Sequence, residues 1–164
     1  MKQPKITIEK EKSDKVIEVI GLIALFILIL LPLYYFNSLP DEVPRHFDHK
    51  GDPTAFSGKN MIWLFPAIGV VMYVALAWLT RFPHLYNYPK PITKENAEKQ
   101  YRHATKLIRI LNTVIVSLFA YIQLVILKTA MGETSGLGVW FLPVFLLLVF
   151  APIVWFTVKS IRSY

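Results

Sequence analysis

The chain has 164 residues and no cysteine; 54% of its residues are hydrophobic, 14% are aromatic, and the mean hydropathy is +0.44. This composition excludes an ordinary soluble domain, and the lack of cysteine excludes disulfides and cysteine-based metal or redox chemistry. The net charge of +7 does not call for nucleic acid as a partner, because basic residues serve to orient a membrane protein in the bilayer.

Four apolar runs are long enough to cross a lipid bilayer. They cover residues of about 16–36, 60–80, 107–127 and 139–158. Apolar runs of about 18 or more residues are typical of transmembrane helices. The uncharged part of the first run, residues 19–36, exceeds the apolar core of a signal peptide, roughly 7–15 residues, so we interpret the run as an uncleaved span. The sequence thus predicts an all-α integral membrane protein, with residues 1–164 forming a single four-helix bundle domain in the lipid bilayer.

A short polar loop at 37–59 separates the first two predicted spans. The sequence HKGDP at 49–53 predicts a turn in this loop, in which Gly51 supplies a positive φ. The apolar side chains of Phe47 and Phe56 flank the turn. We therefore expect the loop to dock back onto the spans and to form an ordered cap over the helix bundle.

A second polar connection, at 81–106, joins the second and third predicted spans. It begins with RFPHLYNYPKP, whose three prolines predict irregular, extended backbone. An amphipathic pattern then follows at 94–108. We expect this segment to be helical and either to lie at the membrane interface or to continue directly into the third span.

The third predicted span carries more polar side chains than the other spans. Arg109 lies at its start, where we expect the guanidinium to reach the interface while its stem stays in the apolar region. Asn112 and Gln123 form a polar face further along. Such residues commonly form hydrogen bonds between neighbouring membrane helices, so bridging is the role that we expect for both.

The distribution of basic residues predicts the orientation in the membrane. Fourteen of the eighteen lysines and arginines lie on the side of the two termini and the 81–106 connection. The cytoplasmic loops of membrane proteins are enriched in basic residues. The sequence therefore predicts that both termini are cytoplasmic and that the 37–59 loop is extracytoplasmic.

The polar residues of the outward loop are the candidate functional residues. They are His46, Asp48, His49, Gly51, Asp52 and Lys59. Three interpretations remain open. His46 and His49, together with the Asp48 and Asp52 carboxylates, could hold a metal ion such as zinc. His46 could handle protons or ions, because histidine titrates near neutral pH. The loop could instead be a structural plug, with His46 hydrogen-bonded and Lys59 paired with Asp48 or Asp52.

The chain contains no catalytic or cofactor-binding motif of a hydrolase, zinc protease, P-loop protein or dinucleotide-binding protein. No predicted span has Asp or Glu in its middle, which disfavours a carboxylate-driven pump and an intramembrane aspartyl protease. We therefore expect a protein that is not an enzyme and needs no cofactor. A metal-dependent membrane enzyme, with the ion at His46 and His49, is the least favoured alternative.

The outward loop resembles the hallmark of a bacterial membrane family, a domain of unknown function found at the N-terminal end of SdpI-type immunity proteins. In that pattern a Leu-Pro pair is followed by a further proline shortly before His-Phe or His-Trp, then by Gly, Asp or Pro, and then by Lys before the second span. The matching residues are Leu39, Pro40, Pro44, His46, Phe47, Gly51, Pro53 and Lys59. The cytoplasmic sequence NYPKPITKENAEKQYR also resembles the corresponding connection in such proteins.

The resemblance implies a multi-pass protein of the bacterial plasma (inner) membrane. The namesake of the family protects its cell from a secreted peptide toxin and holds a transcriptional repressor at the membrane. Envelope protection, toxin immunity or signalling is therefore the implied function, with a peptide toxin or a cytoplasmic regulator as partner. A small transporter or ion-conducting assembly using His46, Lys59 and the polar face of the third span remains the alternative. Either function is compatible with a homo-oligomer.

Overall fold

The computed structural model describes residues 3–162. Lys2 and the outermost residues of the predicted 1–164 domain lie outside this range. The helices and strands are α1 (Lys12–Tyr35), β1 (Glu42–Phe47), β2 (Pro53–Gly58), α2 (Leu64–Leu79), α3 (Ala97–Ala130) and α4 (Phe141–Arg162). Short 3₁₀ turns cover Phe36–Ser38, Lys59–Trp63 and Pro83–Leu85.

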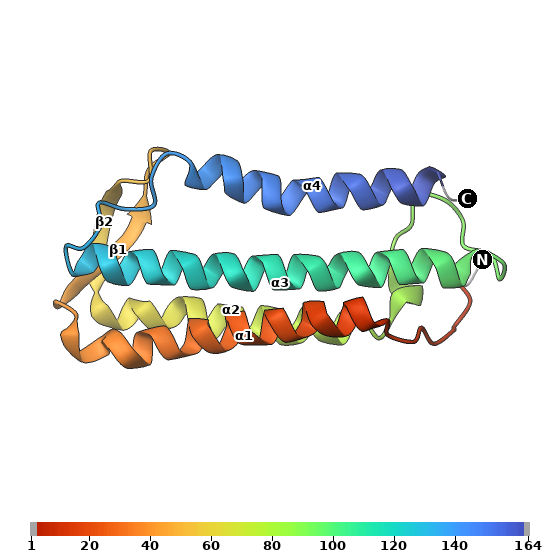
Figure 1. Cartoon of the computed structure of the whole chain (residues 1–164), viewed down its shortest axis with the longest axis horizontal. Helices are drawn as coiled ribbons and strands as arrows, with labels where there is room; N and C mark the ends of the chain where they lie inside the picture. The colour runs from red at the N-terminus through yellow and green to blue at the C-terminus, as the bar shows by residue number, and fades with distance from the viewer. Residues whose placement is uncertain (1–2, 163–164) are drawn as a thin grey trace.

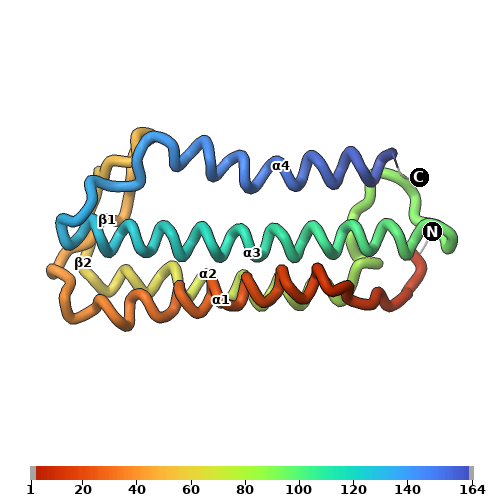
Figure 2. Tube along the Cα trace, in the orientation of Figure 1, coloured from red at the N-terminus to blue at the C-terminus, as the bar shows by residue number. Residues whose placement is uncertain are grey.

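The four long helices run up and down, side by side, with the two strands at one end of the bundle (Figure 1). Both ends of the chain lie at the opposite end, together with the connection between α2 and α3, as the backbone trace in Figure 2 also shows. We call these the strand end and the terminal end. All four helical segments are long and apolar enough to cross a membrane. The predicted α-helical membrane fold is therefore confirmed.

Two helices extend further toward the terminal end than the predicted spans. α1 begins at Lys12, and its first turn is capped where the Asp14 carboxylate accepts a hydrogen bond from the backbone N–H of Glu11 (3.0 Å). α3 begins at Ala97 and runs without interruption into the third span. The amphipathic segment therefore continues directly into the span, which was one of the two predicted arrangements.

α3 is the central helix of the bundle and packs on α1, α2 and α4. Its 34 residues extend over about 51 Å at the usual helical rise. Buried residues recur every three or four positions and so share one face. They include Tyr101, Thr105, Arg109, Asn112, Val116, Ala120, Gln123 and Leu127. This buried stripe is polar toward the terminal end and mostly apolar toward the strand end.

Two glycines allow α1 and α2 to approach their neighbours closely. A Cβ atom on Gly21 of α1 would lie 2.8 Å from the Thr113 hydroxyl oxygen of α3. A Cβ atom on Gly69 of α2 would lie 2.5 Å from a methyl carbon of Leu28. Small residues at helix contacts are a common means of close packing in membranes. α1, α2 and α3 thus form a tight three-helix core.

α4 packs less closely than the other helices. Only 6% of the most apolar stretch of α4 is buried within the chain, compared with 44% of the corresponding stretch of α3. Its exposed side chains are mostly large and apolar, with Leu147, Phe150 and Trp155 among them. Such a surface suits contact with lipid along most of the helix.

The outward loop contains regular secondary structure that was not predicted. β1 and β2 form a two-stranded antiparallel hairpin, with Val43 opposite Ser57 and Pro44 opposite Phe56. The register shifts between Pro44 and His46, which marks a bulge at Arg45. The hairpin is small, so the all-α class holds. The prolines keep the backbone extended on both sides of the 49–53 turn. The turn brings these two extended segments together, and they pair as strands.

Candidate functional site

The base of the hairpin is docked on the helix bundle. Val43 is 1% exposed and belongs to an apolar cluster with Leu39, Ile62, Ile126 and Leu127. Phe47 packs against the same cluster, as predicted for a docking residue. Phe56 does not, because its side chain is 51% exposed. The loop is therefore a folded cap with one aromatic side chain left on its surface.

The tip of the hairpin is organised around the Asp48 carboxylate. Its Oδ1 atom accepts hydrogen bonds from the backbone N–H groups of Lys50 (2.8 Å) and Asp52 (3.0 Å). Gly51 follows with φ of 85°, as the predicted turn requires. The hydrogen bond from the Asp52 backbone is the main cause that lowers the pKa of Asp48. The Asp48 side chain thus holds the turn together.

The tip is also clamped by the connection between α3 and α4. The Leu137 backbone N–H donates to the Gly51 carbonyl oxygen (2.8 Å). A Cβ atom on Gly51 would lie only 2.3 Å from the Gly138 nitrogen. Figure 1 shows this connection lying beside the strands. The hairpin is consequently fixed at its base by the helices and at its tip by a second loop.

The two histidines of the loop lie on the surface of the hairpin. His46 is exposed, and its Nδ1 atom is hydrogen-bonded to the Thr54 hydroxyl at 2.7 Å. His49 is exposed at the turn. Within residues 3–162, no three His, Asp or Glu side chains gather closely enough to hold a metal ion. His46 thus makes a cross-strand hydrogen bond, and a metal ion at His46 and His49 stays a prediction.

Lys59 lies where the hairpin joins α2, and its partner differs from the two that were predicted. Its ammonium group is 3.7 Å from the Asp41 carboxylate, rather than near Asp48 or Asp52. It also lies 5.4 Å from the centre of the Phe36 ring. We expected Lys59 to pair with an aspartate near the turn. Strand pairing instead brings the start of β1, which Asp41 precedes, beside the end of β2, which Lys59 follows.

Arg109 does not reach out to the interface as predicted but lies inside the bundle at the terminal end, with 7% of its surface exposed. Its Nε atom donates to the Glu18 carboxylate (3.0 Å), and Nη1 lies 3.7 Å from the Asp14 carboxylate. The sequence contained a signal for this network. An arginine in an apolar run needs a partner, and Asp14 and Glu18 are one helical turn apart on the neighbouring span.

The two polar residues predicted to bridge helices behave differently. Asn112 donates from its side-chain nitrogen to the Tyr73 carbonyl oxygen of α2 (3.1 Å) and so joins α3 to α2. Gln123 is fully buried, and neither polar atom of its amide has a hydrogen-bond partner in the described chain. Val116 and Ala120 lie between them on the same face, within an apolar cluster that includes Leu28. This cluster separates the two polar positions.

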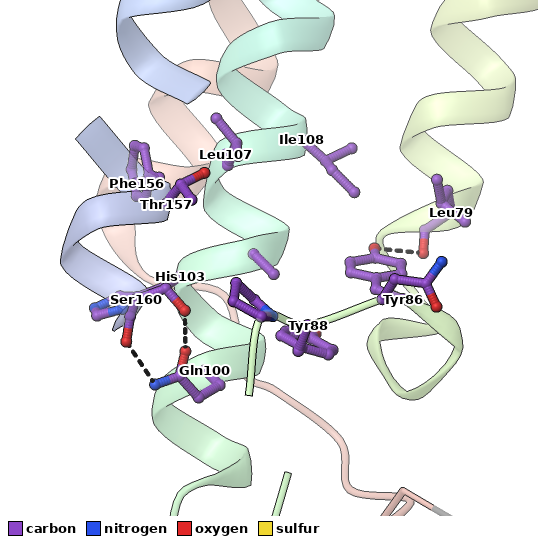
Figure 3. Close-up of a pocket in the computed structure, with 13 residues that line it drawn as sticks. Leu79, Tyr86, Tyr88, Gln100, His103, Leu107, Ile108, Phe156, Thr157 and Ser160 are labelled. Atoms are coloured by element: carbon purple, nitrogen blue, oxygen red, sulfur yellow. Dashed lines mark hydrogen bonds between the residues drawn. The ribbon is translucent and has the colours of Figure 1, made fainter. Parts of the chain in front are cut away.

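A cavity of about 340 Å³ lies at the terminal end between α3, α4 and the segment 86–89. Figure 3 shows Gln100 of α3 paired with Ser160 of α4 at one side of it, where the Ser160 hydroxyl and the Gln100 side-chain oxygen are 2.5 Å apart. At the other side the Tyr86 hydroxyl donates to the Leu79 carbonyl oxygen (2.8 Å). Burial raises the pKa of Tyr86 to about 12. The sequence analysis did not predict this cavity, since its walls come from segments far apart in the chain.

The part of the chain that contains the hairpin is similar to known proteins. Residues 23–70, which run from α1 through both strands into α2, match the family model of a domain of unknown function (DUF1648). An uncharacterized protein of the archaeon Archaeoglobus fulgidus is 32% identical over 73 residues, covering 43% of this chain. The match spans 40% of the length of that relative. No solved structure matches the chain.

Proposed function

We propose that this chain is a non-enzymatic, cofactor-independent membrane protein of SdpI-like type that protects the cell envelope. In this proposal it lies in the plasma membrane with both termini in the cytoplasm. Its hairpin then faces outward, where it meets a membrane-active peptide toxin before the toxin reaches the lipid. In a more specific version of this proposal, the terminal end also binds a cytoplasmic regulator and so signals that the toxin is present.

The observation that carries the proposal is a rigid hairpin that exposes an aromatic side chain. Fixing the hairpin at base and tip lowers the entropy that binding would cost. The exposed residues of its two strands include Arg45, His46, Thr54 and Phe56, and we call these four the hairpin surface. Arginine and large aromatic residues are enriched among the residues that contribute most to protein recognition. The hairpin surface therefore suits binding to a peptide.

The contacts of the ionisable loop residues also favour binding over catalysis. Asp48 is occupied by the backbone of its own turn, and Lys59 is beside Asp41 and Phe36. His46 is hydrogen-bonded to a hydroxyl group across the hairpin. These groups hold the hairpin in shape, and none of the three is directed at a shared point where a substrate would react.

The transporter alternative has one favourable observation, which is the unpaired amide of Gln123 inside the bundle. A transport path would have to join Gln123 to Asn112 and to the hairpin. Apolar clusters around Val116 and around Leu127 interrupt that line on both sides of Gln123. The bundle would have to open at two places before an ion could pass, so we favour the protective function.

Complementation of a gene deletion tests the proposal. The deletion strain should become more sensitive to a panel of pore-forming cationic peptides, and the wild-type gene should restore resistance. Phe56→Ala and His46→Ala should fail to restore it, with a loss of about tenfold in the tolerated peptide concentration for a contact of about 1–2 kcal/mol. Membrane abundance of each variant, measured by immunoblotting, separates loss of binding from loss of protein.

Leu85→Ala is the matched control, because Leu85 is an equally isolated apolar residue, 66% exposed, at the terminal end. It should restore resistance fully. The proposal is wrong if the deletion leaves sensitivity unchanged across the panel. It is also wrong if Phe56→Ala and Leu85→Ala protect equally well at equal abundance.

A further inference from the structure

A polar crevice opens between α1, α2 and α3 near the terminal end of the bundle. It has a volume of about 360 Å³, and Lys10, Arg81 and Arg109 are among the residues that line it. A neighbouring cavity of about 190 Å³ is lined by the same three cations. Three basic side chains from three separate segments of the chain therefore converge on one place.

The crevice keeps an excess of positive charge after its internal ion pairs are counted. Glu18 accepts hydrogen bonds from Lys10 (2.7 Å) and from Arg109 (3.0 Å), and Asp14 lies behind Arg109. Arg81 is exposed, and its guanidinium makes no ion pair with any residue in the described range 3–162. Glu18 in the crevice and Asp14 behind it together offset two of the three cations, so a group with one negative charge would complete the site.

An apolar furrow continues from this crevice along the outer surface of α2. Its walls are Val70, Val71, Val74, Ala75 and Trp78. Val74 and Trp78 line the crevice as well, so the two hollows adjoin. Val71 is 69% exposed and Trp78 58% exposed. A cationic pocket that leads into an apolar furrow matches the shape of a molecule with an anionic head and a hydrocarbon tail.

We propose that the crevice and furrow together bind one anionic phospholipid. Its phosphate lies among Lys10, Arg81 and Arg109, and one acyl chain follows α2 past Val74 and Val71. The depth is suitable, because α2 ends at Leu79 and Arg81 follows two residues later, where a membrane helix meets the headgroups. Basic pockets between membrane helices are known to hold anionic headgroups. This site lies at the opposite end from the hairpin and is independent of the hairpin's function.

Competition between two lipids tests the proposal on the purified full-length protein in detergent. The protein is given equimolar phosphatidylglycerol and phosphatidylcholine with identical acyl chains, and native mass spectrometry measures the ratio of the two bound lipids. The ratio should clearly favour phosphatidylglycerol. Arg81→Gln should lower it about fivefold, since one basic residue near an anionic headgroup contributes roughly that factor. Arg81 has no ion pair to lose, so the variant should fold normally.

Arg162→Gln is the matched control, because it removes the same charge at the same end of the bundle, on α4 and outside the crevice. It should leave the ratio unchanged. Ala75→Phe fills the furrow and should reduce the amount of either lipid that is bound. The water-soluble anion glycerol 3-phosphate should not displace phosphatidylglycerol.

Several outcomes would overturn the proposal. A ratio near one in the wild-type protein would show that the crevice has no preference for an anionic head. An equal ratio in Arg81→Gln and Arg162→Gln would show that the crevice cations do not provide the preference. Unchanged lipid binding in Ala75→Phe would remove the furrow from the site. Displacement by glycerol 3-phosphate would assign the crevice to a soluble phosphate compound instead.

Discussion

Arg109 is the side chain on which the packing of the terminal end most depends. Its guanidinium is buried between α1 and α3, with 6% of the side chain exposed, and the neighbouring Asp14 side chain is 3% exposed. Arg109 and Asp14 are stable at this depth only together, because each charge would be costly to bury alone, and Glu18 joins them from the half-exposed edge of the network. The three residues therefore fix how α1 lies against α3.

Arg109→Ala should destabilise the protein by about 3 kcal/mol, because it leaves the Asp14 and Glu18 charges without their buried partner. Thermal unfolding in detergent measures the effect. Arg102→Ala is the control, since Arg102 pairs with Glu11 and Glu98 on the surface, where such pairs contribute at most about 1 kcal/mol. Equal losses in the two variants would contradict the buried network.

Asp48 gives the tip of the hairpin a defined dependence on pH. Its pKa is lowered from 3.8 by hydrogen bonds that exist only in the folded turn. A carboxyl group with a lowered pKa stabilises the fold above its unfolded value and loses that effect as the pH falls through the folded value. The tip should therefore keep its order down to about pH 4 and loosen below 3.8.

Hydrogen exchange at the Asp52 backbone amide, corrected for the intrinsic exchange rate, measures this loosening directly. Protection should be constant from neutral pH to about pH 4 and then decrease. The Asp48→Asn variant keeps a side-chain acceptor but has no titrating group, so its protection should not change with pH. A decrease that is the same in both proteins would exclude Asp48 as its cause.

At the scale of elements, the hairpin depends on a loop that is distant in sequence. The connection between α3 and α4 contacts Gly51 so closely that no side chain fits there. This contact explains why the hairpin can be ordered although two strands alone are only marginally stable in water. The hairpin and the helices should accordingly lose their order together.

Gly51→Ala should destabilise the cap by about 1–3 kcal/mol, because the new Cβ atom would collide with Gly138 and φ is positive. Thermal unfolding measures the loss, and sensitivity of the hairpin to protease reports it locally. Gly58→Ala is the matched control, since a Cβ atom there would meet nothing within 4 Å. If the two variants have equal stability, the clamp at the tip does not stabilise the hairpin.

The sequence predicted the elements that follow from local pattern and missed those that depend on distant contacts. Apolar run length predicted the four spans, and the HKGDP sequence predicted the turn at Gly51. Strand pairing was missed because Pro44 interrupts the alternation that usually marks a strand. The burial of Arg109 and the 340 Å³ cavity were missed because their partners come from other helices.

At the scale of the whole molecule, the helices separate two chemically different ends. The strand end carries a small folded cap, while the terminal end carries most of the basic residues, a charged network and a cationic crevice. This asymmetry is what the proposed function requires. Recognition of a peptide needs the cap outside the cell, and contact with anionic lipid or a regulator needs the basic end inside.

Labelling of single cysteines tests this arrangement most directly, and the natural chain has no cysteine to interfere. Lys50→Cys places a thiol at the exposed hairpin turn, and Lys94→Cys places one in the exposed connection before α3. In intact spheroplasts a membrane-impermeant maleimide should label Lys50→Cys only, and Lys94→Cys should react only after the membrane is permeabilised. Labelling of Lys94→Cys with protection of Lys50→Cys would place the hairpin in the cytoplasm and contradict the account.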